Sequence, residues 1–239
     1  MLGTVATSST FQRARSSENK TQRRESILAA AAQLATRDGV RQVTLTDIAA
    51  RVGMHKSALL RYFETREQIF LELTGRCWRD WAAAVRAGLA DVASDNAVPG
   101  AAAVLAHEFA ARPLLCDLIP HTALNLERHA SIAAVRAYKL ISLGAVEDAA
   151  AALKGPLPEL AVEDRRQLVA TVALLAGAMY QIATPPPPLA ELYAIDPELA
   201  HALLDLEPRL TRAAEITIAG LQALPERQQL VGDRTRDLD

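Results

Sequence analysis

Residues 44–63 constrain this chain more than any other stretch, because they predict two short helices joined at a glycine. Thr44 and Asp47 have the spacing of a capping box, in which a hydroxyl and an acid satisfy free backbone groups at a helix start. Gly53 can take the left-handed conformation that ends the first helix. The second helix begins near Lys56 and carries polar and basic residues. This is the pattern of a helix-turn-helix, whose second helix lies in the major groove of DNA.

The apolar residues of this stretch have the spacing that two crossing helices need. Ile48, Ala49 and Val52 fall on one face of the first helix. Leu59 and Phe63 can point inward from the second. The apolar side chains therefore form an inner face, which leaves the polar side chains of the second helix outside.

The segment from about Thr21 to Leu73 resembles the DNA-binding domain of the TetR family of bacterial transcriptional regulators. Residues 23–34 resemble the first helix of that family, and Asp38-Gly39-Val40 resembles its usual end. Residues 62–70 resemble the aromatic pair, short turn and start of the long fourth helix. The resemblance covers roughly a quarter of the chain without a gap, and the combined pattern is more specific than a lone helix-turn-helix.

Polar side chains inside this pattern are candidates for DNA contact. We expect Thr44, Tyr62 and Arg66 to bind phosphates, which positions a protein without reading sequence. Lys56 and Arg61 could contact phosphates or guanine edges. The alternative for each residue is a solvated helix face. The full predicted set is Thr44, His55, Lys56, Ser57, Arg61, Tyr62 and Arg66, of which His55 and Ser57 could reach base edges or waters.

Charge is divided unevenly along the chain. The net charge of −2 at pH 7 argues weakly against a nucleic-acid-binding protein. Residues 1–66, however, hold eleven Lys and Arg against five Asp and Glu, which gives +6, and the remainder carries −8. The positive charge therefore lies in the segment with the helix-turn-helix, as a DNA-binding surface requires.

The composition favours an all-α fold with an N-terminal three-helix head and a larger helical body, about nine helices in total. The chain is 50% apolar and only 4% aromatic, and its abundant alanine suits helices that pack closely. Helical periodicity predicts long helices at about 66–93, 162–183 and 208–224. The predicted domains are a disordered arm at 1–20, a helix-turn-helix DNA-binding domain at 21–66, a helical ligand-binding and dimerisation domain at 67–226, and a polar tail at 227–239.

Several classes of protein are disfavoured by what the sequence lacks. No apolar run reaches the roughly 18 residues of a membrane-spanning helix, and the basic start has no apolar core of a secretory signal. Cys77 and Cys116 match no metal or redox spacing, and His121 and His129 have no tight ligand cluster around them. We therefore expect a cytoplasmic protein with no membrane association, no cofactor and no metal.

Two other functional classes were weighed against a DNA-binding regulator. An enzyme finds no support, because the chain has no nucleophile elbow, phosphate-binding glycine loop or histidine–carboxylate cluster. A helical scaffold that binds only protein would explain the alanine-rich body. It would not explain the basic, capped helix-turn-helix.

The TetR resemblance also implies a homodimer, since members of that family usually pair their last two long helices across a two-fold axis. Such a dimer would read a palindromic operator in double-stranded DNA with its two heads. The alternative is that the same apolar faces form the core of one chain. The predicted interface residues are Val172, Leu175, Met179, Ala214, Thr217, Ile218 and Leu221.

The resemblance further implies a pocket for a small-molecule inducer in the body, and hence a repressor that a ligand releases from its operator. The candidates are aromatic or polar groups within apolar helical stretches, and each could instead be an ordinary core or surface residue. A ligand bound among them would be small and mostly apolar. The candidate residues are Trp78, Trp81, His107, His121, Asn125, Tyr138 and Tyr180.

Overall fold

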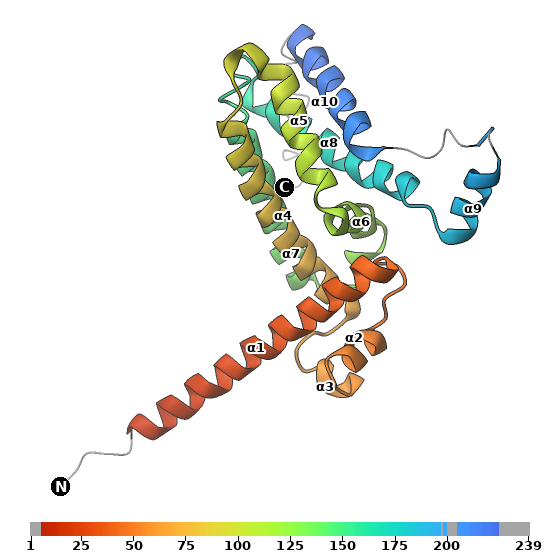
Figure 1. Ribbon diagram of the computed structural model, residues 1–239. Coiled ribbons are helices and arrows are strands. Elements are labelled where there is room, and N and C mark those ends of the chain that lie inside the picture. The colour runs from red at the N-terminus through yellow and green to blue at the C-terminus, as the bar shows by residue number, and fades with distance from the viewer. Residues whose placement is uncertain (1–5, 197, 200–204, 225–239) are drawn as a thin grey trace, which may run out of the picture. The chain divides into compact units, whose positions relative to one another are not determined.

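The computed structural model describes residues 6–196, 198–199 and 205–224, with side chains from residue 18 onward. Over these residues the chain is helical without a strand, which confirms the predicted all-α fold (Figure 1). The predicted tail at 227–239 lies outside the described residues. In chain order the elements are α1 (Ala6–Asp38), α2 (Leu45–Arg51), α3 (Lys56–Leu59), α4 (Arg66–Ala90), the 3₁₀ turn η1 (Ser94–Asn96), α5 (Ala97–Ala110), α6 (Pro113–His121), the π-helical turn η2 (Thr122–Leu126), α7 (Ile132–Ala152), α8 (Val162–Ala183), α9 (Pro187–Ile195) and α10 (Leu206–Ala223).

Helix α1 begins at Ala6, so residues 6–20 are helical where the sequence favoured a disordered arm. No glycine or proline interrupts the chain between Ala6 and Asp38, and each residue added to a formed helix gains a backbone hydrogen bond. The buried face of α1 begins only at Ile27 and continues through Ala31 and Leu34 at helical spacing. Packing therefore holds the second half of α1.

The chain divides into two compact units that do not follow the predicted boundary between head and body. Unit 1 comprises Met1–Asp80 and Arg112–Leu143, and unit 2 comprises Trp81–Ala111 and Gly144–Asp239. Helices α4 and α7 contribute residues to both units. The predicted DNA-binding head therefore shares its compact unit with α6 and η2.

Unit 1 is built on the apolar face of α1. Helices α2 and α6 both pack against α1, and α3 packs against α2. Ile27 of α1, Ile48 of α2 and Leu59 of α3 are fully buried, as are Phe63 and Phe70 beyond them. This core anchors the short helix α3 through its inner face.

Unit 2 is a bundle in which α5 packs against α8 and α10, and α10 also packs against α8. Trp81 at its core is fully buried, with its ring centroid 4.6 Å from that of Phe109 and an interplanar angle of 30°. Ala101 and Ala102 of α5 are fully buried as well. Small side chains therefore let the helices of unit 2 approach closely, as the composition predicted.

The proline run ends α8 and starts α9. Pro187 and Pro188 occupy the first helical positions of α9, where a missing N–H costs nothing. Helix α9 bends away from α8 by 72° and buries none of its residues. Among the described residues, no single helix has the length and apolar character to span a membrane, and only α8 and α9 taken together as a bent pair meet both criteria.

Candidate nucleic-acid interface

The capping box predicted at the start of α2 is confirmed. The Asp47 N–H donates to the Thr44 hydroxyl oxygen at 3.2 Å, and the Thr44 N–H donates to the Asp47 carboxylate at 2.8 Å. The Thr44 hydroxyl also donates to that carboxylate at 2.6 Å. This hydroxyl hydrogen bond, supported by the one from the backbone, lowers the pKa of Asp47. The first helix of the motif therefore has a fixed start.

The turn between α2 and α3 also has the predicted geometry. Gly53 has φ of +66°, the left-handed region that disfavours other residues. The Met54 N–H donates to the Ala49 carbonyl at 2.9 Å and closes the end of α2. His55 then takes an extended conformation as the N-cap of α3. These local contacts set the direction in which α3 leaves the turn.

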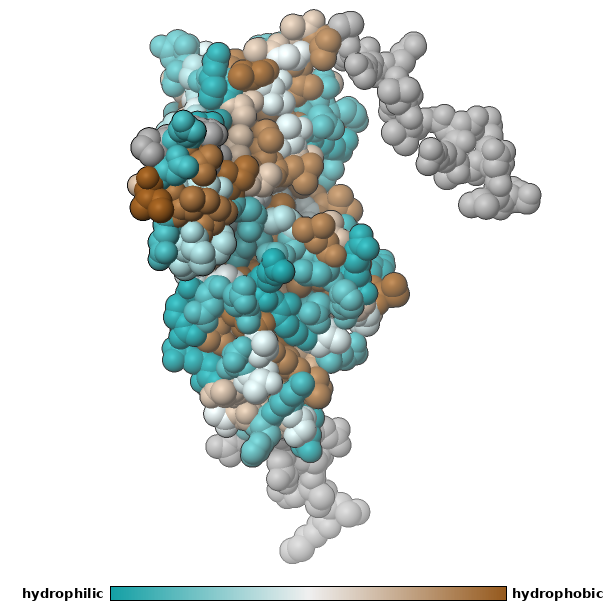
Figure 2. All heavy atoms as spheres, turned by 90° about the vertical axis from the view of Figure 1, so that its right-hand side faces the viewer, coloured by the Kyte–Doolittle hydropathy of each residue, from teal (hydrophilic) through white to brown (hydrophobic). Residues whose placement is uncertain are grey.

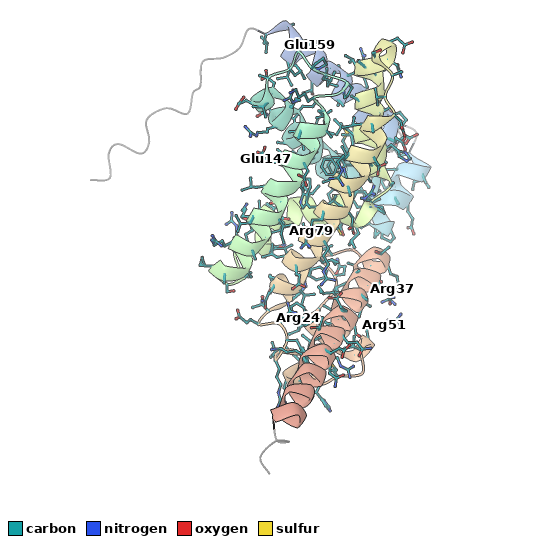
Figure 3. The ribbon with its side chains drawn as sticks, turned by 90° about the vertical axis from the view of Figure 1, so that its left-hand side faces the viewer. Arg24, Arg37, Arg51, Arg79, Glu147 and Glu159 are labelled. Carbon is teal, nitrogen blue, oxygen red and sulfur yellow. The ribbon has the colours of Figure 1, made fainter. Side chains whose placement is uncertain are left out.

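The inner side of α3 is held by apolar burial and by Arg24 of α1. Leu59 and Phe63 are almost fully buried. The Arg24 guanidinium lies 4.1 Å above the Phe63 ring and donates to the Tyr62 carbonyl and to the Glu72 carboxylate. Figure 3 labels Arg24 beside α1. Sequence reasoning did not assign this role to Arg24, because its partners lie 38 and 48 residues away. Arg24 thus ties the end of the motif to α1 and α4.

Most of the predicted polar residues in and next to α3 are exposed. His55, Lys56, Ser57 and Arg61 are exposed, whereas Tyr62 is half-buried. Within the described part of the chain, neither Lys56 nor Arg61 takes part in an ion pair. Both cations are therefore available to an external anion such as a phosphate.

Arg66, by contrast, is already engaged within unit 1. Its guanidinium donates to the carbonyls of Val40 and Val43, pairs with Glu67 at 3.2 Å and lies 4.6 Å above the Phe70 ring. These contacts brace the turn between α1 and α2 from the start of α4. The phosphate contact predicted for Arg66 stays a prediction, and the observed contacts favour a structural role.

The seven predicted ligand residues are divided between the two units. In unit 1, Trp78 and Tyr138 are buried and His121 and Asn125 are half-buried. The Asn125 side-chain oxygen is buried without a hydrogen-bond partner, and burial lowers the pKa of His121. In unit 2, Trp81 packs on Phe109, Tyr180 is half-buried and His107 is exposed. The His107 Nδ1 atom lies 3.0 Å from the Glu207 carboxylate.

Unit 2 also contains two hollows. One, of about 480 Å³, is lined by charged residues at the start of α10, including Glu207 and Arg212. The other, of about 190 Å³, lies between the start of α8 and the end of α10 and includes Asp164 and Leu221. Neither hollow is lined by a predicted ligand residue, so the ligand site stays a prediction.

Cys77 and Cys116 both lie in unit 1 and are reduced thiols, not a disulfide. Burial raises the pKa of Cys77 to about 11 and that of Cys116 to about 12. Both side chains are therefore protonated at neutral pH, which makes them weak nucleophiles and weak metal ligands.

The predicted dimer residues occupy two environments in unit 2. Val172, Ala214 and Ile218 are fully buried among the helices of their own chain. The other four, Leu175, Met179, Thr217 and Leu221, are half-buried. The large apolar side chains that α8 and α10 expose are different ones and include Leu174 at 68%, Ile182 at 49% and Ile216 at 58%. The structure contains one chain, so it leaves the interface itself a prediction.

Comparison with family models finds matches over both parts of the chain. A model described as "Bacterial regulatory proteins, tetR family" matches residues 27–73. A model described as "Tetracyclin repressor-like, C-terminal domain" matches residues 76–225. The second match alone covers more than half of the chain. No curated protein sequence matches the chain.

Solved structures with the same fold cover nearly the whole chain at low sequence identity. The fatty acid degradation regulator FadR from Bacillus halodurans is 14% identical with a TM-score of 0.53, over 82% of this chain and 98% of its own. The TetR-family regulator PfmR from Thermus thermophilus is 18% identical with a TM-score of 0.52, over 84% and 99%. The FadR repressor of Thermus thermophilus, solved in complex with lauroyl-CoA, is 18% identical with a TM-score of 0.54, over 87% and 100%.

Proposed function

The chain belongs to the TetR family of DNA-binding transcriptional regulators, and we propose that it is a cytoplasmic homodimeric repressor that a small, mostly apolar ligand releases from a palindromic operator. The observation that carries the proposal is the exposed, basic surface at α3 on a fixed helix-turn-helix. Lys56 begins α3 and Arg61 follows its C-terminal end, and neither forms an ion pair within the described residues, while buried Leu59 anchors the helix. Such a helix can enter the major groove with its polar side chains against bases and phosphates.

The target is found by selecting genomic fragments with the full chain and footprinting the enriched duplex at two salt concentrations. A protected near-palindrome whose affinity falls steeply as salt rises is the expected result, because bound cations release counterions from DNA. Absence of any enrichment by folded protein would contradict the proposal.

The assignment of α3 is tested by Lys56→Ala and Arg61→Ala on the recovered duplex. We expect each change to weaken operator binding by about tenfold or more and to lower the salt slope by about one for a phosphate contact. The matched control is Lys154→Ala, which removes an exposed cation from unit 2. Equal affinities for all three variants would place the DNA-binding surface elsewhere.

We propose that the dimer forms through the exposed apolar faces of α8 and α10. Leu174, Ala178 and Ile182 recur four residues apart on α8 and are all exposed, and Ile216 is exposed on α10. Figure 2 shows hydrophobic residues gathering on unit 2 around α9, while the first three helices of unit 1 present mostly hydrophilic ones. Exposed apolar patches of this kind mark interaction sites.

Sedimentation of Leu174→Glu tests this interface. An unpaired glutamate buried in the interface would destabilise the dimer, so the variant should shift toward monomer. Ile132→Glu is the control, because Ile132 is 84% exposed on α7 in unit 1. A Leu174→Glu variant that remains as dimeric as Ile132→Glu would rule out this face.

We propose that the ligand carries an apolar hydrocarbon tail and binds in unit 1, next to its polar side chains. Trp78 and Tyr138 supply apolar walls, and His121 and Asn125 supply polar atoms. Lauroyl-CoA is the first probe, because it is bound by the Thermus thermophilus FadR of the same fold. We expect the protein to release its operator as lauroyl-CoA is added, and we expect Asn125→Leu to need more lauroyl-CoA for the same release. Failure of lauroyl-CoA, dodecanoate and other apolar probes to change DNA affinity would contradict a ligand of this class.

A further inference from the structure

The turn between α1 and α2 is fastened by a carboxylate that belongs to neither helix. The Val40 N–H donates to the Asp117 carboxylate of α6 at 2.7 Å, across 77 residues of sequence. We propose that Asp117 is a positioning residue that fixes this turn and thereby sets how α3 meets the operator. The inference rests on the proposed function, because it concerns the specificity of DNA binding.

The hydrogen bond lies in the interior of unit 1. Asp117 is 8% exposed and Val40 is 1% exposed. Hydrogen bonds to a charged partner are about twice as strong as neutral ones, and a buried N–H left without an acceptor is costly. Asp117 therefore resists displacement from the turn by water.

The turn that Asp117 binds depends on a glycine. Gly39 has φ of +84°, the left-handed region that disfavours other residues, so it lets the chain reverse just before Val40. A Cβ atom at Gly39 would meet the Asp117 Oδ2 atom only at ordinary contact distance, 3.9 Å. The next residues, 40–43, lead straight into Thr44, which caps α2. A shift of the turn would consequently move the start of the helix-turn-helix.

The same turn is held from a second side. Arg66 donates to the carbonyls of Val40 and Val43, so both the N–H and the C=O of Val40 are bound by charged side chains. The other oxygen of Asp117 lies 3.6 Å from the His121 Nε2 atom, one helical turn further along α6. A cation and an anion from different helices therefore determine the position of one short backbone segment.

This arrangement matters for specificity because base readout depends on the orientation of α3. Side chains that read a site must be held within about 0.5 Å of their working geometry by a supporting shell. By sequence α6 falls in the predicted body at 67–226, whereas by packing it belongs to unit 1 with the head. Asp117 is thus a residue of the body that contributes to the geometry of the head.

The test compares affinity for the recovered operator with affinity for a random duplex of equal length. We expect Asp117→Ala to lower the operator-to-random affinity ratio by about tenfold, since a buried charged hydrogen bond is lost. Asp117→Asn keeps an acceptor oxygen and should restore most of the ratio. Thr122→Val is the control, because the Thr122 hydroxyl is also buried but donates to the Leu118 carbonyl at 2.9 Å, four residues back, and not to the α1–α2 turn.

A merely structural role would lower both affinities by the same factor, through the fraction of folded protein. An unchanged ratio in Asp117→Ala, or an equal fall in Thr122→Val, would overturn the inference. A wild-type chain that prefers no duplex would instead refute the proposed function.

Amide exchange followed by NMR decides the inference even if Asp117→Ala does not fold or no operator exists. In the wild-type chain the Val40 amide should exchange far more slowly than that of exposed Arg41, and Asp117→Asn should speed exchange at Val40 selectively. A Val40 amide that exchanges as fast as Arg41 in the wild type would exclude a fixed turn and overturn the assignment.

Discussion

Unit 1 is tied together by charged side chains that bond distant backbone groups, whereas unit 2 is packed through small and apolar residues. Arg24 reaches the Tyr62 carbonyl, Arg66 reaches two carbonyls of the α1–α2 turn, and Asp117 accepts the Val40 N–H. Each of these bonds joins a helix to a turn or to the end of another helix.

In unit 2, by contrast, small residues lie where neighbouring segments come close together. A Cβ atom on Gly88 would lie 2.9 Å from a methyl group of Val104, and one on Gly100 would lie 2.7 Å from a methyl group of Val92. Contacts this close leave no room for a larger side chain.

The difference follows from what each interaction can fix. Hydrogen bonds depend on angle as well as distance, so they determine orientation. Apolar packing is non-directional and determines mainly how close two helices lie. Directional bonds suit a unit that must present α3 at a set angle to DNA, and close packing suits a unit that must hold its helices together.

The largest expected effect is in the core of unit 2. Trp81→Ala removes a fully buried ring that packs at a tilt against Phe109. We expect it to lower the free energy of unfolding by about 3–5 kcal/mol, measured by chemical denaturation. A loss below 1 kcal/mol would show that unit 2 does not depend on this packing.

A smaller loss of stability is expected when the hydrogen bonds of Arg66 in unit 1 are removed. Arg66→Met keeps an apolar stem but leaves the carbonyls of Val40 and Val43 without their donor. The free energy of unfolding should fall by about 2 kcal/mol. Arg61→Met, on the exposed side near α3, should change it by less than about 0.5 kcal/mol. If both variants lost the same free energy of unfolding, Arg66 would not differ from Arg61 in supporting the fold.

The glycines offer a matched pair that sharpens the comparison. Gly88→Ala brings a Cβ atom against Val104, whereas Gly144→Ala meets nothing within 4 Å. Thermal unfolding should show that the first change destabilises by about 1–2 kcal/mol. The second should stabilise by about 0.5–1 kcal/mol, because alanine favours a helix over glycine. Stabilisation by both would mean that α4 and α5 are not in close contact there.

Salt should distinguish exposed ion pairs from the buried contacts of unit 1. Arg76 pairs with Glu25 of α1 and with Glu72, at positions partly open to solvent. Arg76→Gln should cost about 0.5 kcal/mol at low salt and nothing measurable at about 1 M salt. A cost that persists at high salt would place this pair with the buried contacts instead.

The smallest expected effect is a pH dependence from His121. Burial lowers the pKa of its imidazole below the ordinary value of 6.5, despite the nearby Asp117 carboxylate. The unfolded chain then binds a proton that the native chain resists, so stability should fall as pH drops below about 6.5. Denaturation at pH 7.5 and 5.5 should show a smaller difference for His121→Gln than for the wild type. An equal difference would assign the pH effect to other groups.

The local parts of the site were predictable because their partners are near in sequence. The capping box joins Thr44 to a residue three positions away, and Gly53 turns the chain through its own backbone freedom. The exposed face of α3 follows from the spacing of Leu59 and Phe63. Such contacts form whenever the segment is helical, whatever surrounds it.

The contacts made by Arg24 and Arg66 were not predictable in this way. The sequence predicted a phosphate contact for Arg66 and assigned no role to Arg24, yet both bond to backbone carbonyls 23 to 38 residues away. Likewise, periodicity marked Val172 and Ile218 as apolar positions but could not say whether their partner is the same chain or a second one. The structure buries both within unit 2.

By itself, the sequence of this protein determined its all-α fold, its helix-turn-helix and the location of its positive charge, because these depend on neighbouring residues and on composition. Only the tertiary structure decided that α6 belongs with the DNA-binding head, that Asp117 holds the turn before α2, and which apolar residues of α8 and α10 stay exposed. These outcomes depend on which segments meet after the chain has folded, and a periodic pattern carries no information about the partner that will cover it.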